Sequence, residues 1–133
     1  MSAARQLRWA VVLIRLDPVE GHEQAGERPC LVVSYEPFHN MGLMTVVPIT
    51  SARTEPRLPG DIALPAGEAG LARPGVVICS HVRTVSVLRI VSPRTAGGRI
   101  QYVMNPALRA RIREALGHHL GLDIRPEADG AEA

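Results

Sequence analysis

Closely spaced apolar segments, each ended by glycine or proline, limit what this chain can fold into. Residues 9–16, 29–34, 43–49, 61–64, 75–82 and 85–91 are rich in aliphatic and β-branched side chains. Runs of this length and composition predict strands. Pro48 lies near the end of the third run and indicates an edge strand or a bulge, because proline cannot donate to a ladder. No helical periodicity separates the early strands, which disfavours a fold of alternating strands and helices.

One helix is predicted after the strands. Asn105 followed by Pro106 is typical of a helix start, because the Asn side chain accepts free amides and proline has none to leave unpaired. Apolar side chains then recur at helical spacing as far as Gly121, which is expected to end the helix, and Arg109, Arg111 and Arg113 fall mostly on the other side. The chain is therefore expected to have a mainly β fold with a C-terminal helix (α+β), arranged as a small curled sheet or open barrel.

Length and charge predict one folded domain with polar ends. The 133 residues are 46% hydrophobic and 21% charged, which are ordinary globular values. We expect a flexible N-terminus at 1–7, the folded domain at 8–122 and a disordered acidic tail at 123–133. The tail holds four carboxylates and one arginine, so the rest of the chain is mildly basic and suits an anionic partner.

Membrane, metal and disulfide functions are not favoured. No apolar run approaches the roughly 20 residues of a membrane helix, and no signal peptide is recognisable, so we expect a cytoplasmic protein without a membrane partner. Cys30 and Cys79 lie inside apolar runs without the spacing of a metal site, which predicts buried, reduced thiols. His118 and His119 are adjacent on the helix and point apart. His39 lies in a loop, and the sequence indicates no partner for it.

The polar segment from residue 16 to 34 gathers groups suited to phosphate chemistry. An imidazole, a carboxylate, an amide and a guanidinium fall within seven positions, and glycines on either side of the first three allow tight turns. These residues are His22, Glu23, Gln24 and Arg28. Such a loop can hold a phosphate.

Three motifs in this chain resemble the signature of the MazF/PemK toxins of toxin–antitoxin modules. The first runs from Leu16-Asp17-Pro18 through Glu23-Gln24 and Arg28-Pro29 to residues 31–34. The second is Val47-Pro48-Ile49-Thr50-Ser51, and the third is Val82-Arg83-Thr84-Val85. The resemblance covers roughly residues 8–122 and includes the trailing helix.

The resemblance implies an SH3-like small barrel of the MazF/PemK/CcdB type that works as a homodimer. The implied activity is a sequence-selective, metal-independent endoribonuclease that cleaves single-stranded RNA, usually mRNA, without a cofactor. The resemblance also implies a cognate antitoxin that neutralises this activity. Metal-free cleavage by the ribose 2′-OH leaves a 2′,3′-cyclic phosphate and a 5′-OH, and it needs a base, an oxyanion clamp and an acid.

The resemblance places Arg28 and Thr50 at catalytic positions. A guanidinium gives up a proton reluctantly, so we favour Arg28 as an oxyanion clamp, while the Thr50 hydroxyl can donate to a phosphate oxygen. Glu23 is the only carboxylate of the motifs placed to act as a base, and it is equally plausible as a solvated charge. The RNA-binding candidates are His22, Gln24, Ser51, His81 and Arg83, and no metal ligand is expected.

Two departures from the family pattern bear on activity. The family usually has Arg-Gly-acid before its first strand, whereas this chain has Arg8-Trp9-Ala10. Just before the third motif, Ser80-His81 replaces the usual acid-Gln, which could change base selectivity or add a general acid.

Two alternatives to the nuclease stay open. One is a CcdB-like toxin that binds a protein such as gyrase, and the other is an inactivated relative that binds only antitoxin or RNA.

Overall fold

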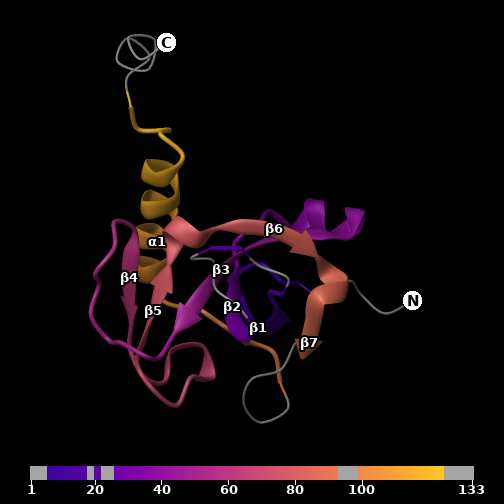
Figure 1. Ribbon diagram of the computed structural model, residues 1–133, viewed down its shortest axis with the longest axis horizontal. Coiled ribbons are helices and arrows are strands. Elements are labelled where there is room, and N and C mark those ends of the chain that lie inside the picture. The colour runs from indigo at the N-terminus through magenta and orange to yellow at the C-terminus, as the bar shows by residue number, and fades with distance from the viewer. Residues whose placement is uncertain (1–5, 18–19, 22–25, 93–98, 125–133) are drawn as a thin grey trace.

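The computed structural model describes residues 6–17, 20–21, 26–92 and 99–124, and all structural statements below concern these residues. They form eight strands, four short 3-10 helices and one α-helix (Figure 1). The strands are β1 (Ala10–Arg15), β2 (Glu27–Val32), β3 (Leu43–Thr50), β4 (Asp61–Leu64), β5 (Gly75–Ile78), β6 (Arg83–Ser86), β7 (Ile90–Ser92) and β8 (Gln101–Tyr102). The 3-10 helices are η1 (Glu36–Met41), η2 (Glu68–Gly70), η3 (Cys79–His81) and η4 (Val87–Arg89), and the α-helix is α1 (Pro106–His119).

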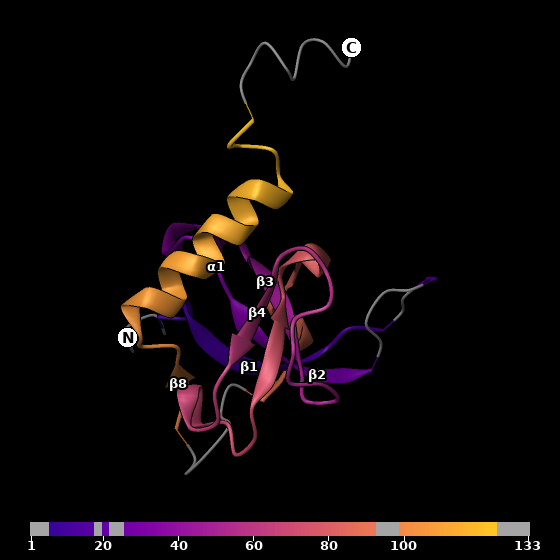
Figure 2. The same ribbon diagram turned by 90° about the vertical axis from the view of Figure 1, so that its left-hand side faces the viewer.

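All strands pair antiparallel in one curled sheet, in the order β4-β5-β3-β2-β1-β7, with β6 on β3 and β8 on β1. β1 and β2 pair from Val11↔Leu31 to Arg15↔Glu27, and β2 and β3 pair from Val32↔Val46 to Cys30↔Pro48. The expected mainly β fold with a C-terminal helix is confirmed. Figure 2 shows α1 lying along one side of the strands.

Alternation along the strands divides the buried side chains between two clusters. Val11, Leu31 and Val47 face α1 and pack with Leu108 and Ile112 of that helix. The residues beside them in sequence, such as Val12, Cys30 and Val46, belong to the second cluster on the other side of the sheet. β1, β2 and β3 are thus buried on both faces over much of their length, which is why the sequence shows apolar runs there rather than a strict alternation of apolar and polar residues.

β3 is a central strand, so of the two expectations for Pro48, an edge strand or a bulge, the edge strand is wrong. On one side β3 pairs with β2, and on the other it pairs with β6 as far as Val46 and with β5 from Ile49. Pro48 falls in the gap between these two partners. A residue without an amide proton is tolerated there because no ladder bond is required on that side.

Two predicted strands end early or split. Strand 75–82 stops at Ile78, whose partner Asp61 is the first residue of β4, so no ladder partner continues beyond it. Residues 79–81 turn instead into η3. The run 85–91 divides into β6, η4 and β7, because the Ser86 hydroxyl accepts the Leu88 amide at 3.1 Å and closes a turn.

The helix begins and ends where the sequence predicts. Asn105 Oδ1 accepts the amides of Ala107 and Leu108 at 2.9 and 3.4 Å. Leu120 is the C-cap, and Gly121 follows with a φ of +72°. His118 pairs with Asp123 at 2.8 Å.

The polar ends predicted at 1–7 and 123–133 lie mostly outside the described residues, so those boundaries stay predictions. Of the first segment, Gln6 and Leu7 are described, and Leu7 is buried in the core.

Cys30 and Cys79 are buried and are not joined by a disulfide bond, and the burial agrees with the sequence-based expectation. Burial raises the pKa of each thiol to about 12.

His39, for which the sequence indicated no partner, has two hydrogen-bond partners. Its Nε2 lies 2.7 Å from the Ser34 hydroxyl and its Nδ1 lies 3.2 Å from the Glu36 carboxylate. Ser34 also accepts the amide of Thr45 at 2.9 Å, so the network fixes η1 to β3.

Candidate active site

Arg28 and Thr50 lie at the same end of neighbouring strands. Arg28 is the second residue of β2 and Thr50 is the last residue of β3. The last paired residues of the two strands are Cys30 and Pro48, so Arg28 and Thr50 each lie two residues beyond that pair. Because side chains alternate along a strand, both are carried on the same face of the sheet as Cys30 and Pro48. The first and second motifs therefore meet at one end of the β2–β3 ladder.

A cavity of about 260 Å³ opens at this end of the ladder. Its lining comes from β2, from the end of β3 and from the segment before β5: Arg28, Pro29, Ile49, Ser51, Leu71, Ala72, Arg73 and Gly75. The described residues that line it include two guanidiniums and a hydroxyl but no carboxylate. Such a lining favours an anion with several oxygen atoms, because each guanidinium offers several donors in one plane.

Arg73 is a member of this cavity that sequence reasoning missed. It is exposed and lies two residues before β5, outside the three motifs. The only signal in the sequence is its position just before the Pro74-Gly75 pair that starts a strand. That signal is too weak to assign a role without the tertiary structure.

Arg83 of the third motif lies near Arg28, and both are close to the thiol of Cys30. It begins β6 and pairs with Val46 of β3, and its Nη1 donates to the Leu16 carbonyl at 3.4 Å. Burial raises the pKa of the Cys30 thiol, and the positive charges of Arg83 and Arg28 partly oppose that rise. Both arginines are therefore near enough to act on the same thiol. The structure brings together the arginines of the first and third motifs.

Thr50 is held in place by its neighbours. It is 7% exposed, and its Oγ1 accepts the Ala52 amide at 3.2 Å. A Cβ added at Gly75 would lie 2.5 Å from the Thr50 carbonyl oxygen, so only glycine allows β5 to approach this closely. Ser51, the next residue, is exposed and lines the cavity.

The loop that leaves Thr50 is anchored by a buried carboxylate. Asp61 Oδ2 accepts a hydrogen bond from Nη1 of Arg53 at 2.5 Å. It also accepts hydrogen bonds from the backbone amides of Arg57 and Leu58 at 2.9 Å each. Burial alone would raise the pKa of Asp61, but the hydrogen bonds from Arg53 and the two amides outweigh it and lower the pKa below its ordinary 3.8. This ion pair restrains the start of the loop next to Ser51.

Not all candidates are brought together. His22, Glu23 and Gln24 lie outside the described residues, so their roles stay predictions. His81 lies on η3, which packs against α1, β3 and β4, and it is not among the residues that line the cavity. Its Nδ1 is buried and has no hydrogen-bond partner in the described part of the chain.

In the described ranges, no group of three or more His, Cys, Asp or Glu side chains is placed to hold a metal ion. Over the same ranges, no helix is long and apolar enough to cross a membrane.

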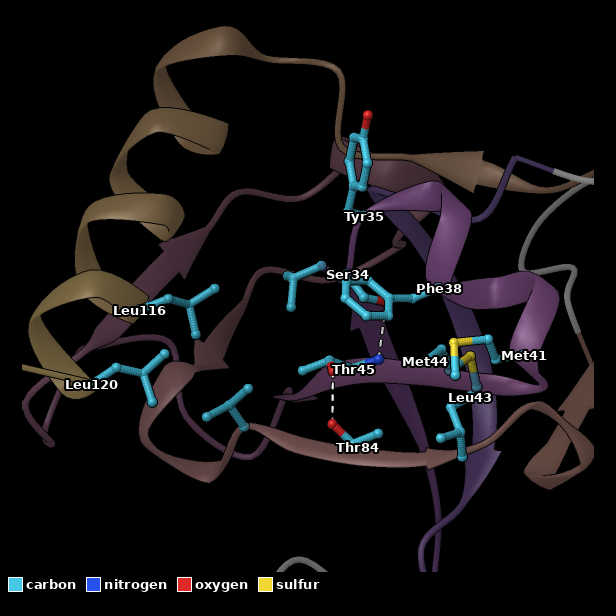
Figure 3. Close-up of a pocket in the computed structure, with 12 residues that line it drawn as sticks. Ser34, Tyr35, Phe38, Met41, Leu43, Met44, Thr45, Thr84, Leu116 and Leu120 are labelled. Carbon is cyan, nitrogen blue, oxygen red and sulfur yellow. Dashed lines mark hydrogen bonds between the residues drawn. The ribbon is translucent and has the colours of Figure 1, made fainter. Parts of the chain in front are cut away.

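A second concave surface is apolar. A groove of about 440 Å³ lies between η1, the paired strands β3 and β6, and the end of α1 (Figure 3). Tyr35, Phe38 and Met41 on one side and Leu116 and Leu120 on the other face it. Phe38 is 57% exposed and Leu120 is 62% exposed. Contiguous exposed apolar side chains of this kind mark protein contact surfaces.

The fold and the arginine-lined cavity define a small, curled β protein with a site suited to an anion. Residues 7–120 match the family described as the PemK-like, MazF-like toxins of type II toxin–antitoxin systems, and the chain belongs to this family. The family resemblance drawn from the three motifs is thus confirmed.

Individual relatives agree with this assignment. The chain is 38% identical over 81 residues to "Endoribonuclease PemK" of Escherichia coli, a match that covers 60% of each protein. It is 30% identical over 121 residues to "Endoribonuclease MazF9" of Mycobacterium tuberculosis, which covers 86% of this chain and 96% of that protein. The crystal structure of MazF from Deinococcus radiodurans superposes with a TM-score of 0.67 at 30% identity, over 90% of this chain and 99% of that one.

Proposed function

We propose that this chain is an endoribonuclease toxin that cleaves single-stranded RNA, such as mRNA, at selected sequences and without a metal ion. The observation that carries the proposal is the cavity at the end of the β2–β3 ladder, where Arg28 and Arg73 converge beside Ser51, the residue that follows Thr50. Its two cations and hydroxyl donor suit a phosphodiester. The relatives described above are named endoribonucleases, which supports the same reaction.

In the proposed reaction the ribose 2′ oxygen attacks the adjacent phosphorus. A P–O bond to the 2′ oxygen forms and the P–O5′ bond breaks, which leaves a 2′,3′-cyclic phosphate and a 5′-OH. Arg28 stabilises the negative charge that develops on the non-bridging oxygens, and Thr50 and Ser51 donate hydrogen bonds to the same group. A base accepts the 2′-OH proton and an acid protonates the 5′ oxygen. We assign the base to Glu23.

RNA contacts beyond the scissile phosphate are assigned to His22, Gln24, His81 and Arg83. Arg83 has structural support for this role because it lies near Arg28. The other three rest on the sequence motifs.

The apolar groove is the surface that we assign to a protein contact. Family membership supports a cognate antitoxin as a partner, and we further propose a homodimer in the cytoplasm. The groove fits a second copy of the chain better than RNA, because most of its lining is apolar and none of the lining side chains is charged.

The proposed activity is tested by incubating the purified protein with long single-stranded RNA in EDTA and mapping the ends. We expect cleavage that leaves 2′,3′-cyclic phosphate and 5′-OH ends. Arg28→Ala is expected to lower the cleavage rate by about 10²- to 10³-fold, because it removes the charge that stabilises the phosphorane-like state. Arg111→Ala is the matched control, since Arg111 is an exposed arginine on α1.

The outcomes separate the alternatives. No cleavage, or equal cleavage by Arg28→Ala, would overturn the nuclease proposal. Binding of RNA without cleavage would indicate an inactivated relative, and loss of cleavage in EDTA that returns with a divalent ion would refute metal independence.

A further inference from the structure

Trp9 has an unusual backbone conformation at the opposite end of the β1–β2 ladder from Arg28. Its φ is +71°, in the left-handed region that a bulky side chain rarely adopts. Its amide donates to the Val32 carbonyl at 2.7 Å, and its carbonyl accepts the Val103 amide at 2.8 Å. The residue is 5% exposed and packs in the core cluster beneath α1. The family pattern usually has glycine at this position. This chain therefore keeps a backbone conformation typical of glycine and adds an indole ring.

Three guanidiniums surround this one ring. The Cζ atoms of Arg8, Arg109 and Arg113 lie 5.5, 5.3 and 5.8 Å from the ring centroid, within the range of a cation–π contact. Arg8 precedes the tryptophan, whereas the other two come from α1. Three like charges at one ring repel one another, and none of the three forms an ion pair with an acidic side chain in the described part of the chain.

The ring and two of these arginines line an open pocket of about 570 Å³, together with Gln6, Glu36, Tyr102 and Met104. The Nε of Arg8 is buried and has no hydrogen-bond partner among the described residues. Glu36, the pocket's carboxylate, instead accepts the backbone amide of Arg8 at 2.6 Å and contacts His39 at 3.2 Å. A buried guanidinium nitrogen without a partner is costly, so the pocket lacks an acceptor that a ligand would supply.

We propose that Arg8, Trp9, Arg109 and Arg113 form an accessory site that binds a phosphodiester of single-stranded RNA away from the cleavage site. The inference rests on the proposed function, because it assigns the ligand to the RNA substrate. Trp9 lies about five strand residues from Ile14, the partner of Arg28, which is a separation of about 16 Å. A phosphate bound here is therefore not the scissile one.

The combination of groups favours RNA over an acidic peptide. A carboxylate needs only the cations, whereas the pocket also places the half-buried ring of Tyr102 beside the arginines. The ring of Trp9, which is 5% exposed, holds the guanidiniums and is not itself free to stack on a base. Stacking surfaces next to cations are how proteins hold single-stranded nucleic acid, because each nucleotide offers both a phosphate and a base.

Trp9 is the single tryptophan of the chain, so its fluorescence reports on this pocket alone. The protein is titrated with a 2′-O-methyl RNA oligonucleotide, which has no 2′-OH to react, over a range of salt concentrations. We expect a saturable change in fluorescence with the wild-type chain. Arg113→Gln, and separately Arg8→Gln, should weaken binding several-fold and reduce the slope of log K against log salt by about 0.7, the effect of one lost phosphate contact.

Arg111→Gln is the matched control, because it removes an exposed charge from the same helix but does not contact the ring. It should leave the fluorescence change in place. The proposal is overturned if Arg113→Gln and Arg8→Gln bind RNA as Arg111→Gln does, even where the wild type cleaves RNA. It is also overturned if polyglutamate, and not RNA, produces the fluorescence change, which would assign the pocket to an acidic protein.

Failure of the proposed function gives a different result. A wild-type protein that neither binds nor cleaves RNA refutes both proposals, whereas one that cleaves RNA with no response from Trp9 refutes only the accessory site. Inorganic phosphate alone is titrated in parallel. A fluorescence change that phosphate reproduces in full, and that RNA does not strengthen, would indicate a site for the free ion and refute the RNA assignment.

Discussion

Thr50 has a hydroxyl whose position is set by backbone atoms rather than by other side chains. It accepts the amide of Ala52, and the close approach of Gly75 fixes the carbonyl of the same residue. The hydroxyl proton is not used in that hydrogen bond, because the oxygen is the acceptor. Thr50 can therefore donate to a phosphate oxygen without losing its structural contact.

Replacement of Thr50 by valine keeps the shape of the side chain and removes its hydroxyl. We expect Thr50→Val to slow RNA cleavage by about 10²-fold, as loss of one oxyanion donor does. Loss of the bond from Ala52 should also lower the free energy of unfolding by about 1 kcal/mol. Thr50→Ser, which keeps the hydroxyl, is the control and should retain most of the cleavage rate. Cleavage by Thr50→Val at the wild-type rate would remove Thr50 from the proposed mechanism.

Between elements, the contact of β5 with the end of β3 decides the shape of the cavity. Gly75 starts β5, and its Cα lies so close to the Thr50 carbonyl that a methyl group cannot fit. Leu71 to Arg73, just before β5, form one wall of the cavity. A change at this crossing should therefore affect both stability and the site.

Gly75→Ala is expected to destabilise the protein by about 1–3 kcal/mol, the usual cost of forcing an extra carbon into a packed region. Thermal unfolding measures this, and cleavage should fall because Thr50 is displaced. Gly117→Ala is the control from α1, where an added Cβ meets nothing within 4 Å. Alanine is the better helix former by about 0.8–1.0 kcal/mol, so this variant should be more stable than the wild type. Equal effects of the two variants would refute the packing argument.

Asp61 anchors the loop after β3, and its lowered pKa predicts that the stability of the protein depends on pH. Since the pKa of Asp61 is lower in the folded protein than its ordinary 3.8, the ionised carboxylate stabilises the fold at any pH above about 4. That contribution is lost as the pH falls through the lowered folded pKa. We expect Asp61→Asn to be less stable than the wild type by about 1–3 kcal/mol at pH 7.

The difference between Asp61→Asn and the wild type should shrink below pH 4, where the native carboxylate also becomes neutral. Denaturant unfolding from pH 7 to pH 2 measures it. A difference that stays constant over that range would show that the charge of Asp61 is not what anchors the loop.

At the scale of the whole molecule, two of the concave surfaces, the cavity beside Arg28 and the groove beside Phe38, differ in chemistry and so in the partners that they suit. The cavity beside Arg28 has two guanidiniums in its lining, and the groove beside Phe38 has no charged side chain. An apolar surface of this kind is stabilised by protein contact, whereas a cationic one attracts a polyanion. We therefore propose that RNA and protein bind to separate faces of the molecule.

Phe38→Asp is expected to weaken self-association by at least tenfold, because it introduces a charge into an apolar contact surface. Folding should persist, since Phe38 is 57% exposed in the single chain. Sedimentation equilibrium measures the mass. Leu88→Asp is the control, because Leu88 is 90% exposed and lies on η4, outside the groove. A wild-type monomer at all concentrations would refute the homodimer, and a Phe38→Asp dimer as tight as the wild type would assign the dimer to another face.

Much of the fold was predictable from local patterns. The strands at 61–64 and 43–49 and the helix after Asn105 follow from apolar runs, breakers and a capping residue, which act over a few neighbouring positions. The early end of the strand at Ile78 was not predictable, because it depends on where the partner strand β4 begins. The two-residue strand β8 has too few residues to leave a pattern.

The sequence by itself determined the family and the order of most strands and of the helix, and it supplied Arg28, Thr50 and Arg83 as candidate site residues, since motifs and short-range propensities are properties of the chain. Only the tertiary structure decided that Arg73 shares a cavity with Arg28 and that three arginines surround Trp9. Helical spacing placed Arg109 and Arg113 on the polar side of α1, but spacing cannot show which ring lies beneath them. Contacts between residues far apart in sequence depend on how the sheet curls and where α1 packs, and these follow from the burial of both faces of the sheet at once.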